Sequence, residues 1–190
     1  LIKRLQTERG MAMLLITHDM GVVAEVADDV AVMRFGRIVE QGSVDAIFHA
    51  PQHPYTQRLL QSTQKLEHSA KAEATAPTSQ PPVLEIRNLS KVYGGSRGLF
   101  GGKAFSIKAV DDVSLTLEAG ESLGIVGESG SGKTTLGRLI LRTVEASSGT
   151  VLYRDHEGRE IDVTGLSKSE LRRFHADVRL IFQDPFASLN

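Results

Sequence analysis

Short apolar runs separated by polar and glycine-bearing stretches recur along the chain of 190 residues. The run at residues 11–17 suits a fully buried parallel strand, and helical spacing follows at residues 20–27. Alternating residues at 29–33 and 37–41 predict a hairpin around Phe35-Gly36. The same reasoning predicts helices at 1–10, 43–50, 54–66, 136–144 and 168–175, and strands at 83–89 (an edge strand), 113–117, 122–126, 150–153 and 178–182. Strands that alternate with helices predict an α/β fold with a mixed sheet and flanking helices.

A polar segment at residues 67–82 interrupts this pattern. Its residues are small, polar and proline-bearing, with almost no large apolar side chain. Such a composition buries too little surface to offset the entropy of ordering, so it predicts a flexible linker. The chain is therefore expected to hold two structured blocks, residues 1–66 and residues 83–190.

The composition narrows the classes of function. A formal net charge of −1 provides no basic field, so we expect no nucleic-acid partner. The absence of cysteine excludes disulfides and thiolate metal sites and fits a reducing compartment. The longest unbroken apolar runs, such as MAMLLI, fall far short of the roughly 20 residues that span a bilayer.

The clearest chemistry lies where the predicted strand SLGIV runs into GESGSGKTT and then into the helical LGRLILR. This fits G-x-x-x-x-G-K-[ST], in which glycines let backbone N–H groups wrap a polyphosphate and a helix N-terminus faces it. Lys133 is expected to reach the β- and γ-phosphates, and the Thr134 hydroxyl to bind Mg²⁺. The predicted nucleotide-binding residues are Gly127, Glu128, Ser129, Gly130, Ser131, Gly132, Lys133, Thr134 and Thr135.

Two smaller motifs end apolar runs in polar side chains. In LLITHDMG, the residues alone favour His18 as a polar residue that caps a strand or the next helix. Another interpretation makes Asp19 a Mg²⁺ ligand, but no glutamate follows it. In IFQDP, the Gln183 amide is placed to bind Mg²⁺ and position water, and the alternative is an ordinary turn at Asp184-Pro185.

Together these stretches resemble the ATP-binding subunits of ABC transporters. The segment LEIRNLSKVY resembles their opening strand, with Tyr93 as the adenine-stacking aromatic and Phe100 or Phe105 as alternatives; IFQDP resembles the Q-loop, and LLITHDM the switch-histidine loop. The stretches HPYTQRLL (53–60) and QDPFASLN (183–190) resemble the oligopeptide/dipeptide (and nickel) branch of bacterial importers. The resemblance implies a P-loop NTPase fold of the ABC type, with His18 and Gln183 as catalytic residues. It implies that the His18 imidazole senses the γ-phosphate by donating a hydrogen bond to it or to the attacking water, and that Gln183 joins Thr134 at the metal.

The chain departs from the family pattern, because neither an LSGGQ-type signature nor an apolar segment ending in Asp-Glu is present. In the family both fall between the Q-loop and the switch histidine. Residues 1–66 therefore resemble the C-terminal part of a first domain, and residues 83–190 the N-terminal part of a second, as in the middle of a tandem ATPase. On this interpretation His18 and Lys133 serve different ATP molecules. A permuted packing of the two blocks into one partial domain is a further possibility.

The resemblance implies an ATP-hydrolysing component of an importer for peptide-like solutes. Its partners would be membrane permease subunits, a second ATP-binding domain and, indirectly, a solute-binding protein. It would lie in the cytoplasm, peripheral on the inner face of the cell membrane. Two alternatives remain, namely a fragment that binds ATP without hydrolysing it and a P-loop ATPase that does not act in transport. The HPYTQRLL and QDPFASLN stretches argue against the second alternative.

Overall fold

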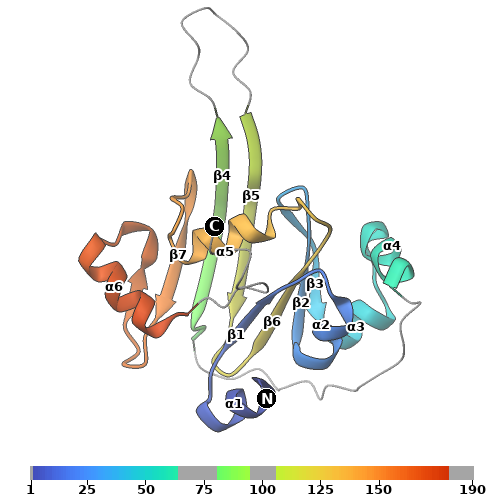
Figure 1. Cartoon of the computed structure of the whole chain (residues 1–190), viewed down its shortest axis with the longest axis horizontal. Helices are drawn as coiled ribbons and strands as arrows, with labels where there is room; N and C mark the ends of the chain where they lie inside the picture. The colour runs from blue at the N-terminus through green and yellow to red at the C-terminus, as the bar shows by residue number, and fades with distance from the viewer. Residues whose placement is uncertain (1, 64–80, 95–105, 180–190) are drawn as a thin grey trace, which may run out of the picture.

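The structure, a computed structural model, describes residues 2–63, 81–94 and 106–179. Its helices are α1 (Ile2–Arg9), α2 (Met20–Val26), α3 (Val44–His49), α4 (Pro54–Thr63), α5 (Lys133–Ile140) and α6 (Lys168–Asp177). Its strands are β1 (Met13–Ile16), β2 (Asp29–Arg34), β3 (Arg37–Ser43), β4 (Leu84–Gly94), β5 (Ser106–Leu117), β6 (Ser122–Val126), β7 (Ser148–Arg154) and β8 (Glu160–Asp162). The α/β class with a mixed sheet and flanking helices is confirmed (Figure 1).

The first sheet is built from both blocks of the sequence. Its strand order is β1-β6-β2-β3, so the strand that precedes the predicted phosphate loop lies between two strands from the other side of the linker. Strands β1 and β2 both run parallel to β6, and β3 returns antiparallel to β2. The single chain thus adopts the permuted packing of its two blocks.

The second sheet is antiparallel and has the order β5-β4-β7-β8. Strands β4 and β5 form the long ribbon that rises above the rest of the molecule in Figure 1, with α6 on the far side of β7. All five residues of β6 are buried, as expected for a strand flanked by parallel neighbours and covered on both faces.

Two apolar clusters cover the two faces of the first sheet. Alternate residues of β2 point to opposite faces. Val30 and Val32 pack with α2, α3 and α4, whereas Ala31 and Met33 pack with α5 and the second sheet. Burial on both faces fixes the register of β2, because a slip of one residue would exchange the two sets.

Several sequence expectations need correction. Strand β1 is half-buried rather than fully buried, because it lies at the end of its sheet and pairs with β6 on one side. Strand β4 is not an edge strand, since β5 and β7 flank it. Helix α5 begins at Lys133, as the phosphate-loop motif implies, and ends at Ile140 instead of residue 144. The sequence pattern does not predict the short strand β8. The linker at 67–80 and most of the predicted strand at 178–182 lie outside the described residues.

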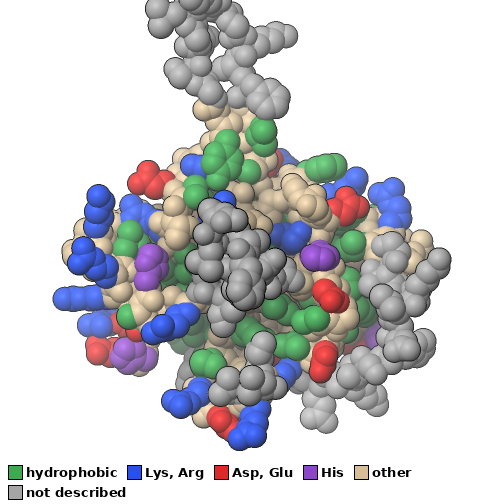
Figure 2. All heavy atoms as spheres, viewed as in Figure 1, with side chains coloured by type: hydrophobic (Ala, Val, Ile, Leu, Met, Phe, Trp, Pro, Cys, Tyr) green, Lys and Arg blue, Asp and Glu red, His purple; other side chains and the backbone are tan. Residues whose placement is uncertain are grey.

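The helix predicted at residues 168–175 is confirmed as α6, and its surface is charged. Basic side chains gather over α6 at the left edge of the space-filling view (Figure 2), and Phe174 is the buried residue of that helix. Over the part of the chain that the structure describes, no helix has the length and apolar character needed to cross a membrane.

Candidate nucleotide-binding site

The carboxyl ends of three parallel strands meet at one edge of the first sheet. Ile16 of β1 pairs with Ile125 of β6, and Val32 of β2 pairs with Val126. His18 therefore follows β1, the phosphate loop follows β6, and the β2–β3 turn follows β2, all at the same edge. In open α/β sheets this is the edge where ligands bind.

The glycines of the loop meet two separate requirements. Gly127, Gly130 and Gly132 all have positive φ, at 153°, 78° and 103°. A Cβ at Gly127 would lie 2.0 Å from the Met33 carbonyl oxygen, and one at Gly132 would lie 2.2 Å from the Ala109 carbonyl oxygen. Close approach by neighbouring backbone thus excludes side chains at these two positions, while Gly130 has open space and is required for conformation alone.

Lys133 folds back over the loop. Its ammonium donates to the carbonyl oxygens of Gly127 at 2.8 Å and Glu128 at 2.9 Å, and more weakly to the Ser131 hydroxyl at 3.4 Å. Burial lowers the pKa of Lys133 below the ordinary lysine value. The loop therefore holds a desolvated cation against neutral oxygens, an arrangement that an anion would stabilise.

The start of α5 is open to a ligand. Its N-cap is Gly132 in the left-handed conformation, and no side chain caps the helix. The first N–H groups of a helix have no partner within the helix and carry its positive dipole end. Thr134 is exposed and Thr135 is half-buried in this first turn, and Ser129 is exposed in the loop. These groups fit a bound phosphate.

His18 lies beside the loop at the sheet edge, with an exposed side chain. The interpretation of Asp19 as a metal ligand is wrong for this structure, because Asp19 is the N-cap of α2. Its carboxylate accepts the N–H groups of Gly21 at 2.9 Å and Val22 at 3.2 Å. His18 is therefore not the capping residue, which removes the simplest structural role for it.

The β2–β3 turn supports the loop from the other side. Gly36 donates its N–H to the Ser131 carbonyl and accepts from the N–H of Asp111, both at 2.8 Å. The Arg37 guanidinium binds the Asp111 carboxylate at 2.6 Å and holds the pKa of that carboxyl below its usual range. These contacts join the two blocks around the loop.

The structure adds Tyr55 to the site, a residue of the HPYTQRLL stretch for which the sequence predicts no role at the loop. The hydroxyl of Tyr55, on α4, accepts the N–H of Glu128 at 2.9 Å, and the side chain is 3% exposed. His53, just before α4, accepts the N–H of Tyr55 at 3.1 Å and so fixes the first turn of the helix. A contact between α4 and the loop cannot be inferred from local spacing.

Tyr93 lies near the end of β4, opposite Ile107 on β5, and its ring is 43% exposed. Residue 109, whose carbonyl approaches Gly132, is two positions along the same β5 strand. The structure thus places Tyr93 on the ribbon that borders the loop. Gln183 and the alternative aromatics Phe100 and Phe105 lie outside the described residues.

A metal would have few protein ligands here. No group of three or more His, Asp or Glu side chains gathers within the ranges that the structure describes. Mg²⁺ usually keeps several waters and binds through a few protein groups together with substrate phosphates. A hydroxyl such as that of Thr134 fits this mode of binding.

The chain is similar in sequence to known transport proteins. Residues 110–190 match the ABC transporter family, and residues 39–98 match the oligopeptide/dipeptide transporter C-terminal region. The whole chain is 45% identical over 213 residues to the glutathione import ATP-binding protein GsiA of Escherichia coli. It is 44% identical to the GsiA proteins of Shigella dysenteriae serotype 1 and Shigella flexneri. In each case the chain spans 33% of the relative's length.

Proposed function

We propose that the chain is part of an ATP-binding protein of the ABC transporter family, and that it binds ATP and Mg²⁺ at residues 127–135 as part of an importer of peptide-like solutes. The observation that carries this proposal is the phosphate loop itself. Its backbone is shaped by close packing, its lysine is desolvated, and the following helix lacks a side-chain cap.

In this proposal Lys133 leaves the loop carbonyls and pairs with the β- and γ-phosphates. The Thr134 hydroxyl holds Mg²⁺, which would neutralise phosphate charge when bound. Tyr93 stacks on the adenine. In the packing of this single chain, the exposed His18 imidazole would donate to the terminal phosphate or to the attacking water, and Gln183 would complete the metal and water site. In a longer tandem protein, His18 and Lys133 would instead serve different ATP molecules.

The two blocks of the chain are proposed to come from two successive ATP-binding domains. The matches support this order, since the importer C-terminal region precedes the ABC transporter match along the chain. In the longer protein each block would pair with the corresponding part of its own domain. The sheet formed here between β1, β6 and β2 would then reproduce the arrangement inside each domain.

Turnover is proposed to require segments from outside the two blocks. The chain has no signature motif and no apolar segment ending in Asp-Glu, which supply the facing domain's contacts and the general base in the family. We therefore expect this chain to bind Mg·ATP weakly and to hydrolyse it near the background rate. The permease and solute-binding partners belong to the longer protein and follow from the family alone.

Limited proteolysis and calorimetry of the 190-residue chain test the proposal. We expect Mg·ATP to protect the chain and Lys133→Ala to abolish protection, while Lys168→Ala on the exposed start of α6 leaves it unchanged. If no ATP analogue protects the chain at any concentration, nucleotide binding fails. If turnover is robust and lost in Lys133→Ala, the expectation that catalysis needs further segments fails instead.

A further inference from the structure

A hollow of about 300 Å³ lies beside the phosphate loop. Its lining comes from three parts of the fold, namely the end of β2, the middle of α4 and the second residue of the loop. The residues are Arg34, Tyr55, Arg58, Leu59 and Glu128. Two guanidinium groups from different elements therefore line one space, at the lower end of the size range of small-molecule sites.

Neither arginine is used by the fold as an ion-pair partner. Within the described ranges, Arg34 and Arg58 form no salt bridge with a carboxylate. The Nε atom of Arg34 is buried and has no hydrogen-bond partner among the described residues. A buried charged donor without an acceptor is unfavourable, so a ligand that supplied an acceptor atom to this N–H group would be stabilised here.

Aromatic rings hold Arg34 in place. Its guanidinium carbon lies 4.7 Å from the ring centre of Phe35 and 4.8 Å from that of Tyr55. Ring contacts use the faces of a guanidinium, and they leave its in-plane N–H groups for an acceptor. The Tyr55 hydroxyl accepts from Glu128 and keeps its own O–H for a further acceptor.

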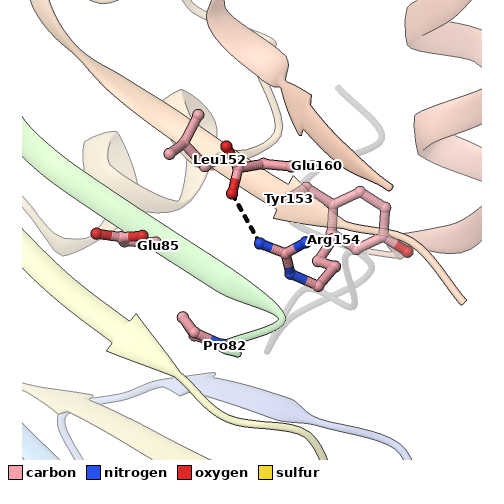
Figure 3. Close-up of a pocket in the computed structure, with 6 residues that line it drawn as sticks. All are labelled: Pro82, Glu85, Leu152, Tyr153, Arg154 and Glu160. Carbon is pink, nitrogen blue, oxygen red and sulfur yellow. Dashed lines mark hydrogen bonds and ion pairs between the residues drawn. The ribbon is translucent and has the colours of Figure 1, made fainter. Parts of the chain in front are cut away.

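Arg154 shows how an arginine looks when its role is structural (Figure 3). It borders a hollow of about 10 Å³, which has room for a water molecule at most. Its guanidinium donates to the Glu160 carboxylate at 2.7 Å and to the Gly158 carbonyl at 3.0 Å. The Nε atom of Arg154 is buried without a partner, as that of Arg34 is, so this atom does not distinguish them. Arg34 and Arg58 differ in that they border the larger space and that no described residue accepts from the rest of either guanidinium.

We propose that this hollow is a second anion site, which binds a small phosphoryl group through Arg34 and Arg58. Arginine forks match the oxygen geometry of phosphate and form strong charge-assisted hydrogen bonds with it. The Glu128 carboxylate also borders the hollow, so the formal charge of the lining is +1. The site therefore suits one small phosphate rather than a polyphosphate.

The proposed anion site and the nucleotide loop have Glu128 in common. Glu128 belongs to the loop, and its N–H is held by Tyr55, which also lines the hollow. Phosphate bound to Arg34 and Arg58 would restrain Tyr55 and, through it, the loop. This site goes beyond the proposed function and does not depend on it, since it uses neither Lys133 nor the helix start.

Titration with inorganic phosphate, followed by calorimetry in a Lys133→Ala background, separates the two sites. We expect binding to survive Lys133→Ala and to weaken about tenfold or more when Arg58→Gln is added, since one charged hydrogen-bonding group is lost. Arg58 is exposed on α4, so this change should not affect folding, which circular dichroism checks. Arg172→Gln on α6, at the opposite end of the molecule in Figure 1, should leave affinity unchanged.

Two further arms sharpen the test. Arg58→Lys keeps the charge but loses the fork, so its affinity should fall between those of Arg58 and Arg58→Gln. Succinate should bind at least tenfold more weakly than phosphate. Equal phosphate binding by Arg58→Gln and Arg172→Gln, loss of all binding in Lys133→Ala, or equal affinity for succinate would each overturn the proposal.

Discussion

Replacement of Tyr55 by phenylalanine tests the contact between α4 and the phosphate loop. Tyr55→Phe removes only the hydroxyl that accepts the Glu128 N–H at 2.9 Å. The ring remains, so its packing in the core and its contact with Arg34 at 4.8 Å are retained. The change therefore isolates one hydrogen bond that joins residues 73 positions apart.

The loss of stability expected for Tyr55→Phe depends on how far the Glu128 N–H is buried. The Glu128 N–H is part-buried, and a donor left without a partner loses more free energy than an average hydrogen bond contributes. We expect Tyr55→Phe to lower the free energy of unfolding by about 1–2 kcal/mol. Because the loop loses a fixed point, affinity for Mg·ATP should fall as well.

Urea denaturation followed by circular dichroism measures the loss. Tyr153→Phe is the matched control, since Tyr153 is 9% exposed and its hydroxyl has no hydrogen bond with other described residues. That variant should lose less than about 0.5 kcal/mol. Equal effects of the two substitutions, or no loss in Tyr55→Phe, would refute the contact.

Three other predictions concern conformation and ionisation. Gly36 has φ +82°, and Gly36→Ala would place a Cβ 2.9 Å from a backbone oxygen; Gly120 has a similar φ of +77° but open space around it. Gly36→Ala should therefore lower the melting temperature more than Gly120→Ala does. Equal decreases would contradict the steric explanation. Burial raises the pKa of Glu121 from 4.5 to about 7, so the fold favours its protonated form and stability should fall as pH rises from about 4.5 to 7. Glu121→Gln should therefore raise the free energy of unfolding by about 1–2 kcal/mol more at pH 8 than at pH 4, after allowance for solvent screening, whereas the control Glu25→Gln should not. The same pH dependence of urea unfolding in both variants would exclude the effect. A bound phosphate should raise the lowered pKa of Lys133, so ATP affinity measured by calorimetry should fall as pH rises through that pKa. Lys133→Arg should make the affinity less dependent on pH, because arginine stays charged. An equally steep fall in that variant would exclude Lys133 as the cause.

Local patterns predicted most elements of the fold. The hairpin around Phe35-Gly36, the helix predicted at 43–50 and the strand predicted at 122–126 all agree with expectation. These features depend on neighbours in sequence, as in the Ser43 hydroxyl that accepts the Ala46 N–H. Strand order is different, because β4 alternates like an edge strand while its second neighbour, β7, lies more than fifty residues away.

The candidate site also combines features that are local in sequence and can be predicted with contacts between distant residues that cannot. The phosphate loop is recognisable because its glycines and lysine must follow one another along the chain. The support that Tyr55 and Gly36 give to the loop was not predictable, since both contacts cross the linker. Arg34 gave no signal either, because an arginine at a strand end becomes notable only when its partners are known.

Crosslinking tests most directly whether the two blocks form one sheet edge around the phosphate loop. The chain has no cysteine, so Arg37→Cys with Asp111→Cys introduces a unique pair where the structure has a contact of 2.6 Å between blocks. A short bifunctional reagent should link this pair within a monomer in high yield. The control pair, Arg37→Cys with Arg172→Cys, should remain unlinked. Absence of an intramolecular link in the first pair, or equal yields in both, would contradict the shared edge.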